Sequence, residues 1–165
     1  MIDHNPNHTE SDKIAEEYYS IADTVHRLAW AFDHNDQSMF HSVFTEDATL
    51  DNRPLGAKIG LDFPVYTSRD EAANAIMPLV GPLDTSHTAS NFRITFTDEN
   101  QVSLHCHMMA QHFRPGQGPK QDTDYYLMMN LWSADLIKVA SEWRIRQLVV
   151  ECAWTMGNRS VITGQ

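Results

Sequence analysis

The sequence predicts an α+β domain in which helices occupy the first half of the chain and strands the second half. Between residues 11 and 33 apolar residues recur at three- and four-residue spacing, which is the period of an amphipathic helix. Between residues 101 and 113 apolar and polar residues alternate, which is the period of a strand with one buried face. With 165 residues, the chain is long enough for one domain with a substantial core. We therefore expect helices on one face of a mostly antiparallel sheet.

Three segments of the first half have the pattern of helices. The first spans residues 11–33, and a short second helix spans residues 37–44. The third begins at Ser68, which forms a capping box with Glu71, and ends before Gly81.

The remaining segments are strands, loops and termini. Five strands are expected, at residues 48–51, 88–97, 101–113, 123–134 and 143–154. Residues 52–67 are rich in Gly and Pro, so we expect a loop there that covers a pocket mouth. Residues 135–142 either extend a strand or form a helical turn. We expect a disordered segment at 1–10, one domain at 11–158 and a tail at 159–165.

Composition excludes several classes of protein. The net charge of −10, from 22 acidic and 12 basic residues, argues against nucleic acid or an anionic membrane as the partner. No apolar stretch approaches the roughly 20 residues that span a bilayer. The polar N-terminus lacks the apolar region of a signal peptide. Two cysteines, Cys106 and Cys152, make no disulfide framework. We expect a soluble cytoplasmic protein.

His112 ends the apolar face of the strand at 101–113. Even positions from Val102 to Ala110 are apolar, so His112 is expected to face a core or a pocket. An unpaired buried polar group costs on the order of 1–3 kcal/mol. The unperturbed pKa of an imidazole lies nearest neutrality, which suits proton transfer. Both a catalytic histidine and a core histidine satisfied by a neighbour fit this pattern.

His105 and His107 stand two residues apart on the other face of the same strand, a spacing that can place two imidazoles on one cation. No third ligand is evident nearby, and neither histidine belongs to an HxxxH or CxxC motif. We therefore predict no metal site.

The order of elements resembles the SnoaL-like group of the NTF2-like (cystatin-like) superfamily. The phrase FHSVFTEDA at residues 40–48 is similar to the helix-to-strand junction of that group. Residues 142–145, EWRI, and 154–158, WTMGN, are similar to its terminal strand pair. The resemblance covers about residues 12–158. It implies a cone, in which three helices pack on a curved, mostly antiparallel sheet and enclose a pocket.

Within this superfamily the chain resembles the scytalone dehydratases most in function. Asp33 matches the aspartate near the end of their first helix, and His87 and His112 match their two active-site histidines. Asn130 is similar to their pocket asparagine on the following strand. The resemblance implies that the two histidines act as acid and base, while Asp33 orients an imidazole and Asn130 supports the pair.

The chain also departs from this resemblance. The scytalone dehydratases use two tyrosines to hold a water, and these positions are Phe32 and Asn52 here. The resemblance therefore supports the class of chemistry more than the substrate. For His87, strand alternation alone predicts an outward side chain, unless a bulge near Ser90 or Asn91 reverses the parity. Asp33 as an exposed helix end is the alternative to its catalytic role.

Several bulky aromatic and methionine side chains are candidates for the pocket wall, together with Asn130, Asn52 and Phe32. They are Trp30, Phe44, Met108, Tyr126, Met128 and Trp154. Asp51, directly before the Gly- and Pro-rich segment, is an alternative carboxylate base.

These observations predict a cofactor-independent lyase, most simply a dehydratase that uses a histidine pair on a hydrophobic cyclic small molecule. The substrate class is polyketide- or terpenoid-like, as in secondary metabolism. One alternative is an isomerase or cyclase of the ketosteroid-isomerase or SnoaL type on the same fold. The other is a non-catalytic ligand-binding or dimerisation domain. We expect a homodimer or homotrimer, with Met109 and Phe113 on the outer face of the sheet.

Overall fold

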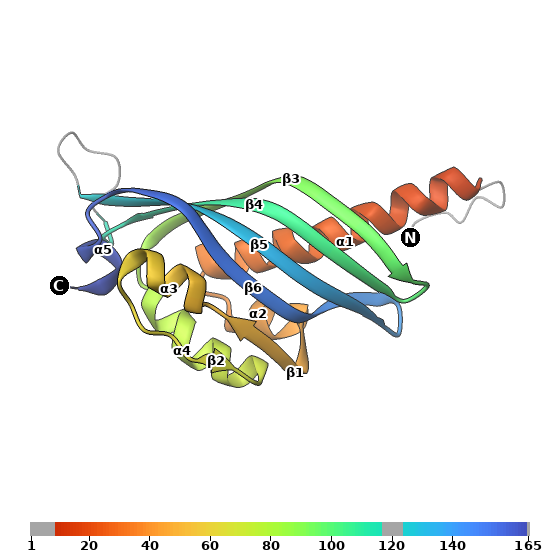
Figure 1. The fold of residues 1–165 in the computed structure, drawn as a ribbon, viewed down its shortest axis with the longest axis horizontal. Coiled ribbons are helices and arrows are strands. Elements are labelled where there is room, and N and C mark those ends of the chain that lie inside the picture. Colours follow the sequence, from red (N-terminus) through yellow and green to blue (C-terminus); the bar gives the residue numbers. More distant parts are fainter. Residues whose placement is uncertain (1–8, 117–123, 165) are drawn as a thin grey trace.

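The computed structural model describes residues 9–116 and 124–164, which form helices packed against one twisted sheet (Figure 1). The helices are α1 (Glu10–Asp33), α2 (Gln37–Val43), α3 (Arg53–Ile59), α4 (Arg69–Val80) and α5 (Ser160–Thr163). The strands are β1 (Phe44–Asp51), β2 (Val65–Tyr66), β3 (Asp84–Asp98), β4 (Gln101–Phe113), β5 (Tyr125–Val139) and β6 (Glu142–Gly157).

The sheet has the order β2-β1-β6-β5-β4-β3. β1 pairs with β6 in parallel, and the other neighbouring strands pair antiparallel. The four long strands arch over α1, while the shorter helices gather below one end of the sheet (Figure 1). The predicted α+β architecture, with helices on one face of a mostly antiparallel sheet, is confirmed.

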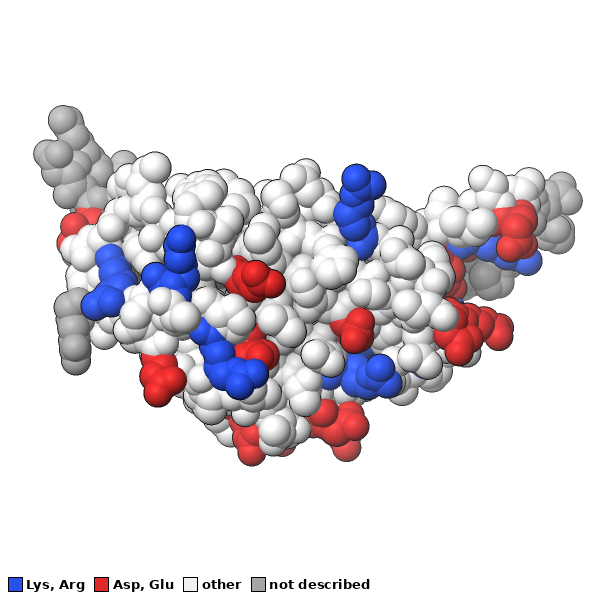
Figure 2. Space-filling view, in the orientation of Figure 1, with Lys and Arg blue, Asp and Glu red and all other residues white. Residues whose placement is uncertain are grey.

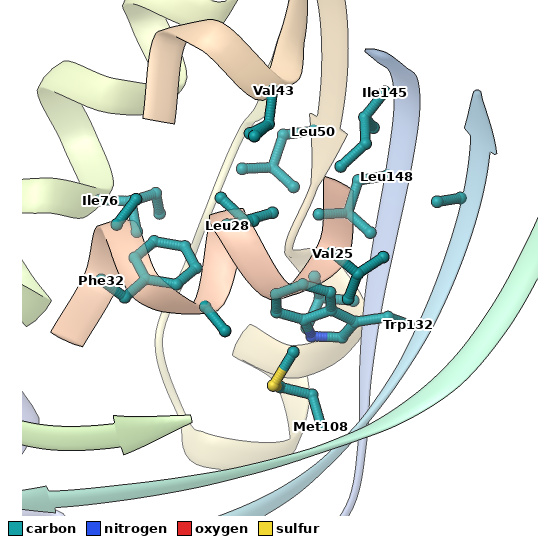
Figure 3. Close-up of a cluster of buried hydrophobic side chains, with 14 of the residues drawn as sticks. Val25, Leu28, Phe32, Val43, Leu50, Ile76, Met108, Trp132, Ile145 and Leu148 are labelled. Carbon is teal, nitrogen blue, oxygen red and sulfur yellow. The ribbon is translucent and has the colours of Figure 1, made fainter. Parts of the chain in front are cut away.

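The core lies between the inner face of the sheet and α1. Side chains of β4 and β5 alternate between buried and partly exposed, as their period-two pattern predicts. Val25, Leu28 and Phe32 follow one another at helical spacing on the buried face of α1. In Figure 3 these residues meet Trp132 and Met108, which come from the sheet.

A bulge divides β3. Its register with β4 shifts between Ser90 and Arg93, and Asn91 adopts the left-handed backbone conformation with φ 56°. The extra residue changes the parity of the strand, so His87 before the bulge and Phe92 after it face the same side. Alternation alone predicts an outward side chain for His87, and this bulge turns it inward.

The predicted loop at 52–67 is wrong in its secondary structure. It contains the short helix α3 and the short strand β2. Leu55 and Ile59, four residues apart, form the buried face of α3. Gly60 ends the helix with φ 73°, a conformation that favours glycine. Pro54 and Gly60 therefore mark the two ends of a helix, and the segment is not a continuous loop.

Several predicted boundaries also move. Thr9 caps α1 in a capping box with Asp12, so the helix already begins at Glu10 and only residues 1–8 of the expected disordered segment fall outside the described residues. Of the two alternatives for residues 135–142, the structure has the longer strand, because β5 continues to Val139. The expected tail contains α5, whose Val161 is buried.

Other strands are longer than expected: β1 begins at Phe44 and β3 at Asp84. Position 123 of the expected strand lies outside the described residues. No helix in the described ranges has the length and apolar character needed to cross a membrane. The face in Figure 2 carries acidic and basic side chains interspersed with one another.

Candidate active site

A mainly apolar cavity lies between the inner face of the sheet and the helices α1 to α5. Its helical side includes Leu55 of α3, Ile76 of α4 and Ile162 of α5. The side chains that bring polar atoms to this wall are Asn52, His87, His112, Asn130 and Trp132. Such a wall suits a hydrophobic ligand that is oriented by a small number of hydrogen bonds.

Asp33 and His87 form a carboxylate–imidazole pair at this cavity. The Nδ1 of His87 lies 2.6 Å from Oδ1 of Asp33, and the backbone N–H of His87 donates to Oδ2 at 3.0 Å. The hydroxyl of Thr85 donates to Oδ1 at 2.8 Å. Burial alone raises the pKa of Asp33. The hydrogen bonds and charge of His87, together with a hydrogen bond from Thr85, outweigh burial, so the pKa of Asp33 lies below its usual value. Asp33 is therefore an ionised carboxylate that orients the His87 ring.

His112 is buried, with 1 % of its surface exposed. The register of β4 against β5 places it opposite Tyr126, whose backbone carbonyl lies 3.1 Å from Nδ1 of His112. A carbonyl can only accept, so Nδ1 carries the proton and Nε2 of the neutral ring has a free lone pair. Burial, with a smaller contribution from the charge of His87, lowers the pKa of His112 to about 4. The ring is therefore neutral at physiological pH.

The two imidazoles face each other across a short distance. Their ring centroids are 5.5 Å apart and the rings stand at 89° to one another. Among the described residues, neither Nε2 has a hydrogen-bond partner. The site thus combines one imidazole beside a carboxylate with a second, neutral imidazole, and both offer Nε2 to a ligand.

Five of the residues expected around the histidines lie in the cavity wall, namely Phe32, Phe44, Asn52, Met128 and Asn130. The ring centroid of Phe32 is 5.2 Å from that of His87. Asn52 and Asn130 are buried, and within the described ranges Oδ1 of each lacks a hydrogen-bond partner. Phe44 and Met128 add apolar surface. The positions at which the scytalone dehydratases have tyrosines, Phe32 and Asn52, therefore both line this cavity.

The prediction that Trp30 and Trp154 line the pocket is wrong, because both lie on the surface rather than in the cavity wall. Trp30 is 55 % exposed and stacks on His34, with ring centroids 3.7 Å apart. Trp154 is 40 % exposed. Asn130 pairs with Cys152, whereas the preceding residue of β5 pairs with Trp154. This irregularity in β6 turns Trp154 to the outer face of the sheet.

The prediction that Met108 and Tyr126 line the pocket is also wrong, for a different reason. Both are buried on the inner face of the sheet, yet neither lines the cavity. Met108 is a core residue beside Trp132 (Figure 3). Tyr126 contributes its backbone carbonyl, which holds His112, rather than its phenol.

The alternative carboxylate base and the histidine pair of β4 lie elsewhere. Asp51 accepts hydrogen bonds from Nε and Nη2 of Arg53 at 2.9 and 2.8 Å and does not line the cavity. His105 contacts Ser133, and His107 contacts Asn91. In the part of the chain that the structure describes, no group of three metal-ligating side chains comes together.

Trp132 and the helical part of the wall were not among the candidate site residues. Trp132 shares its parity with Met128 and Asn130 on β5, so the alternation already placed it on this face. Leu55 and Ile59 carry a four-residue spacing that the Gly and Pro residues around them obscured.

Comparison with known proteins places the chain in a family. Residues 13–149 match the model of the SnoaL-like domain. The chain is 30 % identical over 144 residues to the terrestric acid biosynthesis cluster protein E of Penicillium crustosum, which covers 86 % of each protein.

Solved structures share the fold. A proposed scytalone dehydratase from Novosphingobium aromaticivorans superposes with a TM-score of 0.74 at 19 % identity, covering 90 % of this chain and 91 % of that one. A type 2 hexachlorocyclohexane dehydrochlorinase gives a TM-score of 0.68 at 15 % identity, covering 91 % and 93 %. The domain model matches most of the chain, and the Penicillium crustosum relative aligns with most of it as well. The chain therefore belongs to the SnoaL-like domain family.

Proposed function

We propose that this protein is a cofactor-independent dehydratase that removes water from a cyclic β-hydroxy carbonyl compound of polyketide or terpenoid type. One observation carries the proposal: the Asp33–His87 pair and the neutral His112 meet at one apolar cavity, with ring centroids of the two histidines 5.5 Å apart. An acid and a base within reach of one small molecule are the minimum that elimination of water requires.

The first step is removal of a proton. Nε2 of His87 takes the proton from the carbon next to the substrate carbonyl, and the C–H electron pair passes into an enolate. Asp33 stabilises the imidazolium that forms, because its carboxylate lies 2.6 Å from Nδ1. The side chains of His87 and Asp33 are 6 % and 19 % exposed, and this partial burial strengthens their interaction relative to open water.

The second step is departure of the hydroxyl. The enolate electrons form the carbon–carbon double bond as the carbon–oxygen bond breaks, and the hydroxyl leaves as water with the proton that Nε2 of His87 returns. His112 positions this hydroxyl by accepting a hydrogen bond at Nε2, which its neutral state permits. Asn130 and Asn52 hold the rest of the substrate through amide groups whose Oδ1 atoms lack a partner among the described residues.

The names of the related proteins support this proposal. A dehydratase and a dehydrochlorinase, by their names, both eliminate a small molecule from a substrate, and both share this fold. The Penicillium crustosum relative belongs by its name to a biosynthesis cluster, which supports a substrate from secondary metabolism.

A panel of cyclic β-hydroxy ketones, beginning with 3-hydroxy-1-tetralone, tests the proposal. Purified protein is expected to convert a member of the panel to a product lighter by one water, as measured by mass spectrometry against the uncatalysed reaction. His112→Ala and Asp33→Asn are expected to lower kcat by about 10²- to 10⁴-fold, because the first removes the group that positions the hydroxyl and the second removes the charge that stabilises the His87 imidazolium. Circular dichroism establishes that each variant is folded.

His105→Ala is the matched control, since His105 lies on the same strand as His112 but on the opposite face. Its kcat is expected to equal that of the wild type. An unchanged kcat in His112→Ala contradicts the proposed role of His112. If the product keeps its oxygen, exchanges the α-proton with solvent deuterium or closes a ring, the protein is an isomerase or cyclase rather than a dehydratase.

A further inference from the structure

Trp132 brings to the cavity a hydrogen-bond donor that the mechanism above does not use. Its side chain lines the cavity and is 5 % exposed. The indole Nε1–H is buried, and within residues 9–116 and 124–164 it has no acceptor. Buried indole N–H groups usually have a partner, and they can only donate. Trp132, a residue of the cavity wall, therefore carries an unpaired buried donor that suits an acceptor on a ligand.

Trp132 lies at the end of the site away from the histidines. His112 pairs with Tyr126, and Trp132 follows Tyr126 by six residues on the same face of β5. Phe32 connects the two ends, because its ring centroid is 5.2 Å from that of His87 and 6.5 Å from that of Trp132. In Figure 3, Phe32 and Trp132 point toward one another from α1 and from the sheet. A ring system that packs on Phe32 therefore lies between the imidazoles and the indole.

The indole discriminates between ligands more strictly than the neighbouring amides. Each amide of Asn52 and Asn130 has both a donor and an acceptor, and rotation by 180° exchanges them. Trp132 offers a donor only. A ligand without an acceptor at this point leaves the buried N–H unpaired, and such unpaired groups give strong selection against the wrong ligand.

We propose that Trp132 is a specificity-determining residue and that the substrate carries a second oxygen. Besides the reacting β-hydroxy carbonyl group, the substrate has a carbonyl or ring oxygen at its far end, which accepts a hydrogen bond from Nε1–H of Trp132. This inference rests on the proposed function in one respect, namely that the cavity is the substrate site.

Binding of a matched pair of bicyclic ligands tests the inference. 1-Tetralone has one carbonyl acceptor, and tetralin has a similar ring skeleton without oxygen. Isothermal titration calorimetry is expected to show that the wild type binds 1-tetralone about tenfold more tightly than tetralin. Trp132→Phe keeps an aromatic ring but removes the N–H, so most of this preference is expected to disappear, while the affinity for tetralin stays within about twofold.

The ¹H–¹⁵N resonance of the Trp132 indole is a direct second measurement. It is expected to move downfield with 1-tetralone and to stay in place with tetralin, and Trp132→Phe assigns the peak. Trp154→Phe is the matched control, because Trp154 lies outside the cavity wall, and it should keep the wild-type preference.

Two results overturn the inference. One is an equal loss of affinity for both ligands in Trp132→Phe, which indicates packing alone. The other is a ketone preference that survives the substitution, with an indole resonance that does not move. Because binding is measured without turnover, a failed dehydration assay does not affect this test, and a failed binding test does not affect the assignment of the histidines.

Discussion

At the scale of single residues, Asp33 and His112 have different environments in the same site, and their pKa values shift for different reasons. Asp33 accepts from the ring and backbone of His87, so its charge is compensated and its pKa stays low. Among the described residues His112 has only a backbone carbonyl as its hydrogen-bond partner, and 1 % of its surface is exposed, so burial dominates and its pKa falls. A pair of groups whose environments separate their charge states is a common arrangement for acid–base catalysis.

The low pKa of His112 makes the stability of the protein depend on pH. In the unfolded chain this histidine titrates near 6.5, whereas its folded-state pKa is about 4. Between these values the unfolded state binds a proton that the folded state does not, so the free energy of unfolding falls as pH falls. The expected loss that His112 contributes is about 3 kcal/mol by pH 4, to order of magnitude.

Urea denaturation of the wild type and of His112→Gln, at pH 7 and at pH 4, measures this effect. The glutamine does not titrate, so the variant is expected to lose less stability than the wild type over the same range. Equal losses in both proteins would show that His112 titrates normally in the folded state.

At the scale of elements, α3 shows how a short helix completes the cavity. Leu55 and Ile59 line the wall from the helix, and Phe63 follows from the turn after it. In this turn the backbone N–H of Leu61 donates to the carbonyl of Gly56 at 2.9 Å. The site therefore depends on a close approach between a helix and the chain that leaves it.

Gly56→Ala is expected to disturb this approach. The added Cβ would lie 2.4 Å from the carbonyl oxygen of Leu61 and 2.9 Å from the ring of Phe63, so the turn must move. We expect the free energy of unfolding to fall by about 1–3 kcal/mol in urea denaturation. Ala57→Ser, at the exposed neighbouring position, is the control and is expected to change stability by less than about 0.5 kcal/mol. A Gly56→Ala protein as stable as this control would contradict the close packing.

At the scale of the whole molecule, the ends of α1 serve different purposes. Its C-terminal end supplies Phe32 and Asp33 to the site. Nearer its N-terminus, Glu17 accepts a hydrogen bond from Nε1–H of Trp143 at 2.7 Å and pairs with Lys138, which joins the helix to the ends of β5 and β6. None of these three residues lines the cavity, so stability and ligand binding should respond separately.

Trp143→Phe tests this separation. The ring remains, but the hydrogen bond to the charged Glu17 is lost, and we expect the free energy of unfolding to fall by about 2 kcal/mol. The affinity of the folded variant for 1-tetralone should equal that of the wild type. Trp30→Phe, at an exposed position, should alter neither quantity. A change in ligand affinity in Trp143→Phe would indicate that the two ends of the molecule are coupled.

Local patterns were enough to predict the helix at 11–33, five of the six strands and the inward orientation of His112, because the periods of 3.6 and 2 depend only on neighbouring residues. The orientations of His87 and Trp154 were beyond such patterns. Each follows from an irregularity in strand pairing, and an irregularity arises between two strands rather than within one. Tertiary structure alone brings His87 to Asp33, 54 positions earlier in the chain, because the bulge turns the imidazole toward the end of α1.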